Sequence, residues 1–179
     1  MQHCMIDLET MGNGPNSAIA AIGAVMFDPV SGLGDRFYAL VDLETSVSDG
    51  GVMDASTVLW WLRQSDAARG ALVAGDGMSI LTALTRFGYW LRSVDDRDLK
   101  VWGNGADFDN VILAGAFRRS GFKLPWDFRN NRCFRTLRAL SPDVPWERTG
   151  TAHNALDDAV SQAQHAVKLM RLRHGGDVA

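Results

Sequence analysis

Cysteine is scarce in this sequence, which has only two among 179 residues. Cys4 and Cys133 lie far apart, and neither has a second cysteine or a histidine at a spacing typical of zinc sites. A disulfide framework and a zinc-binding domain are therefore excluded, and we expect both cysteines to be small buried hydrophobic side chains without chemistry. A reducing cytoplasm is the simplest setting for such a chain.

Long hydrophobic runs are also absent. The longest nearly apolar run, residues 18–27, is far shorter than the roughly 20 residues that a membrane span needs. Asp7 and Glu9 interrupt the apolar residues near the N-terminus, so no signal-peptide core fits there. We therefore expect no membrane segment.

Positive charge is not in excess. The 18 Lys and Arg residues against 21 Asp and Glu give a formal net charge of −3, whereas a globally basic nucleic-acid binder has a pI above about 9. Any polyanion must therefore be held locally or through metal ions. The hydrophobic share of 46% excludes a disordered chain. With this length and no repeat or linker, residues 1–179 are predicted to form one domain.

The apolar pattern predicts strands first, followed by alternating helices and strands. The predicted strands are residues 2–9, 17–27, 37–41 and 100–102, with a hairpin connection at 28–34. The predicted helices are residues 56–62 with Ser56 and Thr57 as its cap, 78–94, 109–119, 133–140 and 155–173. The first three strands favour an antiparallel meander. The whole order favours a mixed α/β sheet.

Two carboxylates end the first predicted strand. Asp7 and Glu9 are two residues apart, so their side chains leave the same face of that strand. Like charges held close together in apolar surroundings destabilise a fold, and a divalent cation reverses that penalty. Hard oxygen ligands suit Mg²⁺ or Mn²⁺. The alternative is a strand end whose acids reach solvent.

A second candidate ligand follows the predicted strand at 100–102 and its Gly-Asn-Gly turn. Asp109 begins a predicted helix there, and ligand sites of α/β sheets lie beyond the carboxyl ends of strands. Asp107 is close by and is an alternative ligand. Read alone, both acids also fit a helix N-terminus, where the dipole favours negative charge.

A third candidate segment, residues 153–158, reads HNALDD. A histidine that enters a helix, with an acid one turn later, can place an imidazole and a carboxylate at one site. The small Ala155 between them leaves room for close packing. Alternatively, His153 is a capping or surface residue, and Asp157 and Asp158 are ordinary acids of a first helical turn.

Together, these segments resemble the DEDDh branch of the DnaQ-like 3′–5′ exonucleases. The matching blocks are residues 5–10 (MIDLET), 102–109 (WGNGADFD) and 153–158 (HNALDD). Each block alone is a weak match, but three in the expected order form a strong one. Thr10-Met11-Gly12 and Trp60-Trp61 are similar to a subgroup of phage and prophage exonucleases. That subgroup includes the T-even phage exonuclease A and the Rv2179c-like exoribonuclease domain.

The resemblance implies a fold, a reaction and a catalytic set. The fold is RNase H-like, a five-stranded mixed sheet with its first three strands antiparallel, flanked by helices. The reaction is hydrolysis of phosphodiester bonds from the 3′ end of single-stranded DNA or RNA, releasing nucleoside 5′-monophosphates with two divalent cations, Mg²⁺ or Mn²⁺. The implied metal ligands and general base are Asp7, Glu9, Asp109, Asp158 and His153. The family's spacing selects Asp109 over Asp107 and Asp158 over Asp157.

The resemblance also implies substrate contacts. Met11 corresponds to an apolar wedge against the terminal base, with the Thr10 and Met11 backbone near the 3′-hydroxyl, and Arg135 corresponds to a recurring feature of the subgroup. Trp61 is a candidate for stacking on a base, although core packing is the alternative for both Trp60 and Trp61. Many members of the family are homodimers, and the sequence leaves that state open for this chain.

Three other functions are alternatives to this one. No sequence feature decides between DNA and RNA, because recognition of the 2′-hydroxyl has no signature here. A non-catalytic RNase H-like module that binds nucleic acid or protein is an alternative, but competent residues occupy every position of the catalytic set. A phosphatase with an aspartyl nucleophile usually has a second Asp where Glu9 stands, and it leaves the segment after His153 unexplained.

Overall fold

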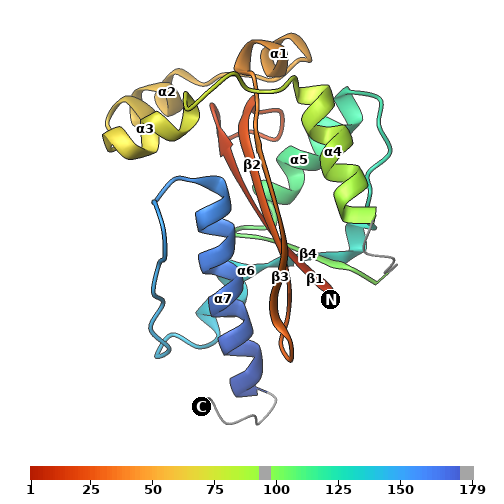
Figure 1. Ribbon diagram of the computed structural model, residues 1–179, viewed down its shortest axis with the longest axis vertical. Helices are drawn as coiled ribbons and strands as arrows, with labels where there is room; N and C mark the ends of the chain where they lie inside the picture. The colour runs from red at the N-terminus through yellow and green to blue at the C-terminus, as the bar shows by residue number, and fades with distance from the viewer. Residues whose placement is uncertain (93–97, 174–179) are drawn as a thin grey trace.

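A five-stranded sheet runs through the centre of the computed structural model, which describes residues 1–92 and 98–173 (Figure 1). Its strands are β1 (His3–Thr10), β2 (Ile19–Asp28), β3 (Gly32–Leu40), β4 (Lys100–Gly103) and β5 (Asn131–Cys133). They lie in the order β3-β2-β1-β4-β5. The pairs β1–β2 and β2–β3 are antiparallel, whereas β1–β4 and β4–β5 are parallel. The expected mixed sheet, with its first three strands antiparallel, is confirmed.

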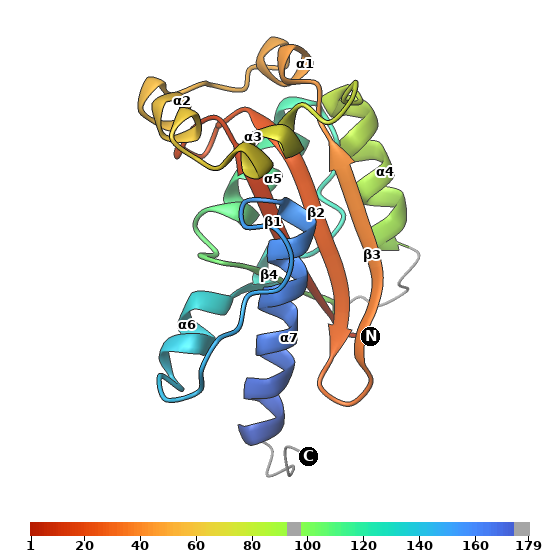
Figure 2. The same cartoon turned by 60° about the vertical axis from the view of Figure 1, so that its left-hand side comes forward.

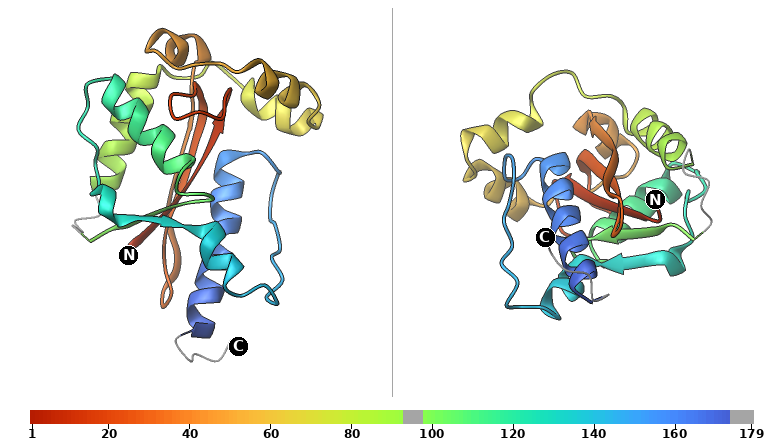
Figure 3. Two further views of the ribbon diagram at one scale, coloured as in Figure 1. Left: turned by 180° about the vertical axis from the view of Figure 1, so that it is seen from behind. Right: turned by 60° about the horizontal axis from the view of Figure 1, so that its bottom comes forward.

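Helices cover both faces of this sheet and one of its ends. They are α1 (Leu43–Ser48), α2 (Ala55–Leu62), α3 (Asp66–Leu72), α4 (Ile80–Arg92), α5 (Asp109–Arg119), α6 (Phe134–Ala139) and α7 (Ala155–Arg173). Helix α7 packs on one face, and α4 and α5 pack on the other (Figures 1 and 2). The view from behind shows α2 and α3 beyond the end of β1 (Figure 3). Within residues 1–92 and 98–173, none of these helices combines the length and the apolarity needed to cross a membrane.

The alternation of side chains along β1 decides which residues meet α7. Cys4, Ile6 and Leu8 belong to the apolar cluster that α4 and α5 complete. Met5 belongs to the other cluster, which α7 and α6 complete. Because successive side chains of a strand point to opposite faces, Asp7 and Glu9 leave β1 on the same side as Met5. The two acids therefore face α7.

Gly23 lets the first turn of α7 lie directly on the sheet. It is the β2 partner of Asp7 in the antiparallel register. A Cβ atom at this position would lie 2.1 Å from the carbonyl carbon of Ala155, closer than any real contact. Ala155 is itself fully buried, in agreement with the close packing predicted for this small residue. The contact brings the start of α7, and with it Asp158, next to the middle of β1.

Some predicted boundaries differ from the observed ones. Helix α2 is capped by Asp54, whose side chain accepts a hydrogen bond from the Ser56 N–H, so the predicted cap at Ser56 and Thr57 is wrong. The predicted helix 78–94 begins later, at Ile80, and its predicted end at Val94 lies outside the described residues. Strand β3 is longer than predicted, and the short helices α1 and α3 were not predicted. The predicted helices 109–119 and 155–173 have the observed bounds of α5 and α7.

Candidate active site

One cavity at the C-terminal end of β1 collects the predicted catalytic residues. Its volume is about 570 Å³. The residues of the implied catalytic set that line it are Asp7, Glu9, Asp109, His153 and Asp158. They come from three distant segments of the chain, and the contacts of β1 with β4 and α7 bring these segments together. We call this cavity the acid cavity.

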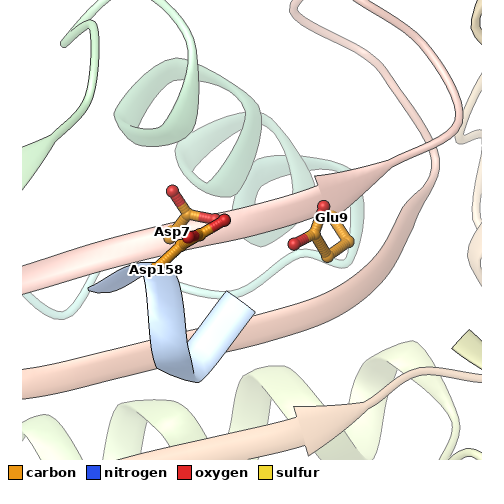
Figure 4. A group of neighbouring side chains, drawn as sticks. All are labelled: Asp7, Glu9 and Asp158. Carbon is orange, nitrogen blue, oxygen red and sulfur yellow. The ribbon is translucent and has the colours of Figure 1, made fainter. Parts of the chain in front are cut away.

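Three of the acids form a compact oxygen cluster. Asp7, Glu9 and Asp158 each offer one carboxylate oxygen, and these oxygens all lie within 4.8 Å of one another. Figure 4 shows that Asp7 and Glu9 extend from β1 while Asp158 comes from the first turn of α7. Clustered carboxylate oxygens are the donors that Mg²⁺ and Mn²⁺ prefer.

Asp109 lines the same cavity but is held differently. Its Oδ1 atom accepts a hydrogen bond from the Leu8 N–H at 3.2 Å, and its Oδ2 atom accepts one from the Asn104 N–H at 2.9 Å. A Cβ atom at Gly103 would lie 2.9 Å from this Oδ2, so a glycine is needed where the carboxylate meets the end of β4. Asp107 is exposed and does not line the cavity, which supports Asp109 as the relevant acid.

Asp158 and its neighbour Asp157 also differ in what they contact. The Oδ2 atom of Asp158 accepts a hydrogen bond from the His153 N–H at 3.0 Å, and its Oδ1 atom lies 3.3 Å from Nε of Arg148. Asp157 instead accepts a hydrogen bond from the Thr151 N–H at 2.8 Å. Only Asp158 lines the acid cavity. The geometry thus favours the acid that the family's spacing selects.

Burial makes the ionised form of these acids unfavourable. It raises the pKa of Glu9 to about 8, with a further contribution from the negative charges of Asp158 and Asp109. Burial also raises the pKa of Asp109 to about 7, although backbone hydrogen bonds oppose the shift. The pKa values of Asp7 and Asp158 are raised for the same first reason. Desolvated like charges of this kind are stable only with a compensating positive charge.

Two carboxylate oxygens in the cavity lack a hydrogen-bond donor. Oε1 of Glu9 and Oδ1 of Asp158 are buried without a hydrogen-bond partner among the described residues. Buried acceptors without donors are rare in folded proteins and mark sites where an ion or water belongs. These orphaned oxygens, the hard donor set and the raised pKa values all fit a bound divalent cation.

His153 reaches the cavity from a strained turn. Its φ angle is 63°, in the left-handed region that residues other than glycine seldom adopt. The imidazole packs edge-on against Trp60, with 5.0 Å between ring centroids, and against Trp61 at 6.1 Å. The backbone N–H bond to Asp158 holds the turn in place. The strain thus positions an imidazole beside the carboxylate cluster.

The two adjacent tryptophans have different environments. Trp61 is only 5% exposed, packs in an apolar cluster with Met11, and donates a hydrogen bond from Nε1–H to the Thr10 carbonyl at 2.9 Å. Trp60 is 42% exposed, and both tryptophans line the acid cavity. The core-packing alternative therefore describes Trp61 but not Trp60, whose ring offers the larger exposed surface. The stacking role of Trp61 stays a prediction.

The other predicted substrate contacts are divided between two cavities. Thr10 and Arg135 line the acid cavity, and Arg135 donates a hydrogen bond from Nη2 to the Asn104 carbonyl at 2.8 Å. Met11 is buried and lines a second cavity, which is largely apolar. The Met11 side chain thus lies outside the lining of the acid cavity, and its role as a wedge stays a prediction.

Gln162 and Arg148 contact the acids of the cavity and were not predicted from the sequence. Gln162, which is 1% exposed, donates a hydrogen bond from Nε2 to Oδ1 of Asp7 at 2.7 Å. It follows Asp158 by four residues, so helical spacing already places both on one face of α7. Arg148 lies in the irregular segment before α7, where no periodicity predicts the path of the chain.

Comparisons with known proteins agree with this geometry. Residues 2–170 match the model of the family described as the 3′–5′ exoribonuclease Rv2179c-like domain. An exodeoxyribonuclease of Enterobacteria phage T4 is 28% identical over 156 residues, and the match covers 74% of this chain and 68% of the phage protein. The family match extends over most of the chain and includes the β1 acids as well as most of α7.

Solved structures of exonucleases share the fold. E. coli exonuclease I, in complex with a dA16 oligonucleotide, superposes with a TM-score of 0.62 at 18% identity, covering 95% of this chain. The chain spans only 40% of that E. coli protein. The nuclease domain of 3′hExo, a DEDDh family member bound to rAMP, has a TM-score of 0.62 at 16% identity and covers 97% of this chain and 92% of that domain. The RNase H-like architecture is confirmed, and the match over residues 2–170 shows that the chain belongs to the family of Rv2179c-like 3′–5′ exoribonuclease domains.

Proposed function

We propose that residues 1–179 form one metal-dependent 3′–5′ exonuclease domain, which hydrolyses phosphodiester bonds at the 3′ end of single-stranded DNA or RNA and releases nucleoside 5′-monophosphates. The observation that carries this proposal is the convergence of the Asp7, Glu9 and Asp158 oxygens within 4.8 Å. His153 and Asp109 line the same cavity. Membership in an exoribonuclease family and similarity to a phage exodeoxyribonuclease support the same reaction class.

The acid cavity would hold two divalent cations, Mg²⁺ or Mn²⁺. Asp7, Glu9 and Asp158 supply the oxygen cluster, and Asp109 adds a fourth carboxylate from the end of β4. Bound cations of this type neutralise the phosphodiester, lower the pKa of an attacking water and stabilise the leaving 3′-oxygen. Gln162 orients the Asp7 carboxylate through its hydrogen bond, so that Asp7 keeps one defined direction.

His153 acts as the general base in this proposal. Its imidazole accepts the proton that the attacking water loses, which is a usual task of histidine in hydrolysis. The Trp60 ring limits the orientations of the imidazole, and the N–H bond to Asp158 fixes its main chain. The base and the carboxylate cluster are thereby held by the same turn before α7.

The 3′-terminal nucleotide would lie between Trp60 and the rim of the cavity. Trp60 offers a partly exposed ring, and stacking of a base on an aromatic ring is worth about 1–3 kcal/mol. Thr10 and Arg135 line the cavity where the sugar and phosphate would lie. Trp61 and Met11 support this surface from the apolar cluster behind it.

A time course on end-labelled oligonucleotides tests the proposal. Single-stranded DNA and RNA, labelled at either the 3′ or the 5′ end, are incubated with Mg²⁺, Mn²⁺ or EDTA. We expect immediate release of the 3′ label as a nucleoside 5′-monophosphate, gradual shortening of 5′-labelled strands, and no reaction in EDTA. Internal cleavage, or loss of the 5′ label first, would contradict the assignment, and comparison of the two sugars identifies the substrate class.

The remaining expectations need other measurements. Oligonucleotide binding seen by fluorescence anisotropy, without cleavage in the time course, would support the alternative, a non-catalytic RNase H-like module that binds nucleic acid or protein. A homodimer stays a prediction that light scattering tests, and a cytoplasmic location stays a prediction from the sequence. The alternative module is disfavoured because a domain that only binds has no need for a cluster of buried, desolvated carboxylates.

A further inference from the structure

Arg148 sits at the edge of the carboxylate cluster without forming a hydrogen bond to it. Its Nε atom lies 3.3 Å from Oδ1 of Asp158, and this oxygen has no hydrogen-bond partner among the described residues. The Arg148 side chain is 38% exposed, whereas Asp158 is only 7% exposed. The pair is therefore an attraction between charges in poor geometry, which is easily exchanged for a better partner.

The main chain next to Arg148 is firmly anchored. The Thr149 N–H donates to Oγ of Ser161 at 2.9 Å, and this hydroxyl contacts the Thr149 carbonyl at the same distance. Ser161 lies on α7, three residues after Asp158, and is fully buried. The Arg148 guanidinium lies 5.5 Å from the centre of the Trp146 ring. The main chain at Arg148 is therefore fixed, whereas its guanidinium can move over the Trp146 ring.

Charge balance suggests what this head group does. The four carboxylates of the acid cavity, when ionised, are neutralised by two divalent cations, so Arg148 then adds a surplus positive charge. A cation beside Asp158 repels the guanidinium. A phosphodiester at the cavity is the group that attracts it, because the planar guanidinium binds two phosphate oxygens at once.

We propose that Arg148 exchanges partners during the reaction cycle: it pairs with Asp158 before cations bind and contacts the non-bridging oxygens of the substrate phosphate afterwards. This inference rests on the proposed function, and it makes Arg148 a substrate-binding residue as well as a counterion. A purely structural ion pair behaves differently. It would weaken cation binding when removed, because the ligand Asp158 would lose its support, whereas an exchanging counterion competes with the cation.

Arg138 provides a matched control. Arg138 belongs to α6, and its guanidinium lies 4.9 Å from the centre of the same Trp146 ring, but it does not line the acid cavity. Arg138→Gln therefore removes a stacked arginine without changing the charge beside Asp158. Arg148→Gln removes a stacked arginine and also the positive charge beside Asp158. A comparison of the two variants isolates the interaction with the carboxylate cluster.

Two binding measurements test the exchange without relying on turnover. Calorimetric titration of the oligonucleotide-free protein with Mn²⁺ should show about two- to five-fold tighter binding for Arg148→Gln, the range expected when a partly exposed competing pair is removed. Fluorescence anisotropy of a labelled single-stranded DNA in Ca²⁺ should show an affinity loss of about ten-fold or more for the same variant. Arg138→Gln should change neither quantity.

Other results would overturn the exchange. Unchanged or weaker Mn²⁺ binding by Arg148→Gln excludes the counterion role, and unchanged oligonucleotide affinity excludes the phosphate contact. If the glutamine variant does not fold, Arg148→Lys serves, because it keeps the charge but not the bidentate geometry: Mn²⁺ affinity should stay as in the wild type while oligonucleotide affinity falls. Failure of the wild-type protein to degrade any oligonucleotide would refute the proposed function but leave the Mn²⁺ comparison valid.

Discussion

The two faces of β1 differ in composition although they belong to one short strand. Toward α4 and α5, Cys4, Ile6 and Leu8 are exposed by 4% or less and pack in an apolar cluster. Toward α7, Met5 is equally buried, but Asp7 and Glu9 take the next two positions on that face. From Cys4 to Leu8 the first face is apolar throughout, whereas the second changes from core to active site between Met5 and Glu9.

This difference shows how the fold tolerates an active site that lowers its stability. Buried carboxylates destabilise the metal-free protein, and the apolar side chains on the opposite face of the same strand offset that cost. Because side chains of a strand alternate between its faces, stability depends mainly on one face of β1 and activity on the other. A substitution on one face should therefore leave the property that depends on the other face largely unchanged. A variant on one face that changes both stability and activity would contradict this separation.

The largest effect is expected on the acidic face. Asp7→Ala removes a ligand of the oxygen cluster and should abolish turnover with Mg²⁺, while the thermal midpoint in EDTA stays the same or rises because one buried charge is gone. Steady-state assays and circular dichroism measure the two quantities. Asp157→Ala is the control, since that acid faces Thr151 rather than the cavity. Turnover near the wild-type level for Asp7→Ala would disprove the ligand assignment.

His153→Ala should have the next largest effect on activity. Loss of a positioned proton acceptor usually lowers the rate by about 10²–10⁴-fold. The carboxylate cluster does not include this side chain, so Mn²⁺ affinity measured by calorimetry should change little. A rate of His153→Ala close to that of the wild type would contradict the general-base role.

Ile6→Ala tests the apolar face. This side chain is fully buried between β1 and the helices α4 and α5, so its truncation should lower the free energy of unfolding by about 2–5 kcal/mol. Activity per folded molecule, measured well below the thermal midpoint, should remain near that of the wild type. Ile6→Val is the matched control and should cost about 0.5–1.5 kcal/mol. A large loss of turnover in folded Ile6→Ala would break the separation of the two faces.

Metal removal should reveal a dependence of stability on pH. The pKa of Glu9 is raised from 4.5 to about 8 and that of Asp109 from 3.8 to about 7, so the folded protein binds more protons than the unfolded chain between these values. In EDTA, unfolding free energy should therefore fall as the pH rises from about 4 to about 8. Urea denaturation measures it. Saturating Mg²⁺ should reduce this fall, because a cation favours the ionised carboxylates.

A rise in the stability of the metal-free protein over the same pH interval would contradict the assigned pKa shifts. Glu9→Gln provides the control, because it removes one of the carboxylates with a raised pKa while keeping the size of the side chain. Its stability should depend less steeply on pH than that of the wild type.

The sequence was sufficient where a pattern is periodic or fixed by spacing. The bounds of α5 and α7 follow from their apolar periodicity, and the spacing of the family motifs separates Asp109 and Asp158 from their acidic neighbours. Strand alternation placed Asp7 and Glu9 on one face. These features depend on local geometry, which the order of residues determines directly.

Other features depend on contacts that no local pattern encodes. Adjacent residues of a helix point about 100° apart, so the pair Trp60-Trp61 indicates that one ring is buried but not which one. The path of the segment that carries Arg148 is set by Thr149 and Ser161, twelve residues apart. The three-residue strand β5 is too short to give a periodic signal and was expected only from the family fold.

The contact between Gly23 and Ala155 has a consequence for how the site binds cations. Main chain rests on main chain there, so the separation between β1 and the start of α7 does not depend on the rotamer of any side chain. The arrangement of the carboxylate cluster is thus fixed by the main chain before an ion binds. An incoming ion meets a preorganised set of ligands, and little of its binding free energy is consumed in ordering the polypeptide.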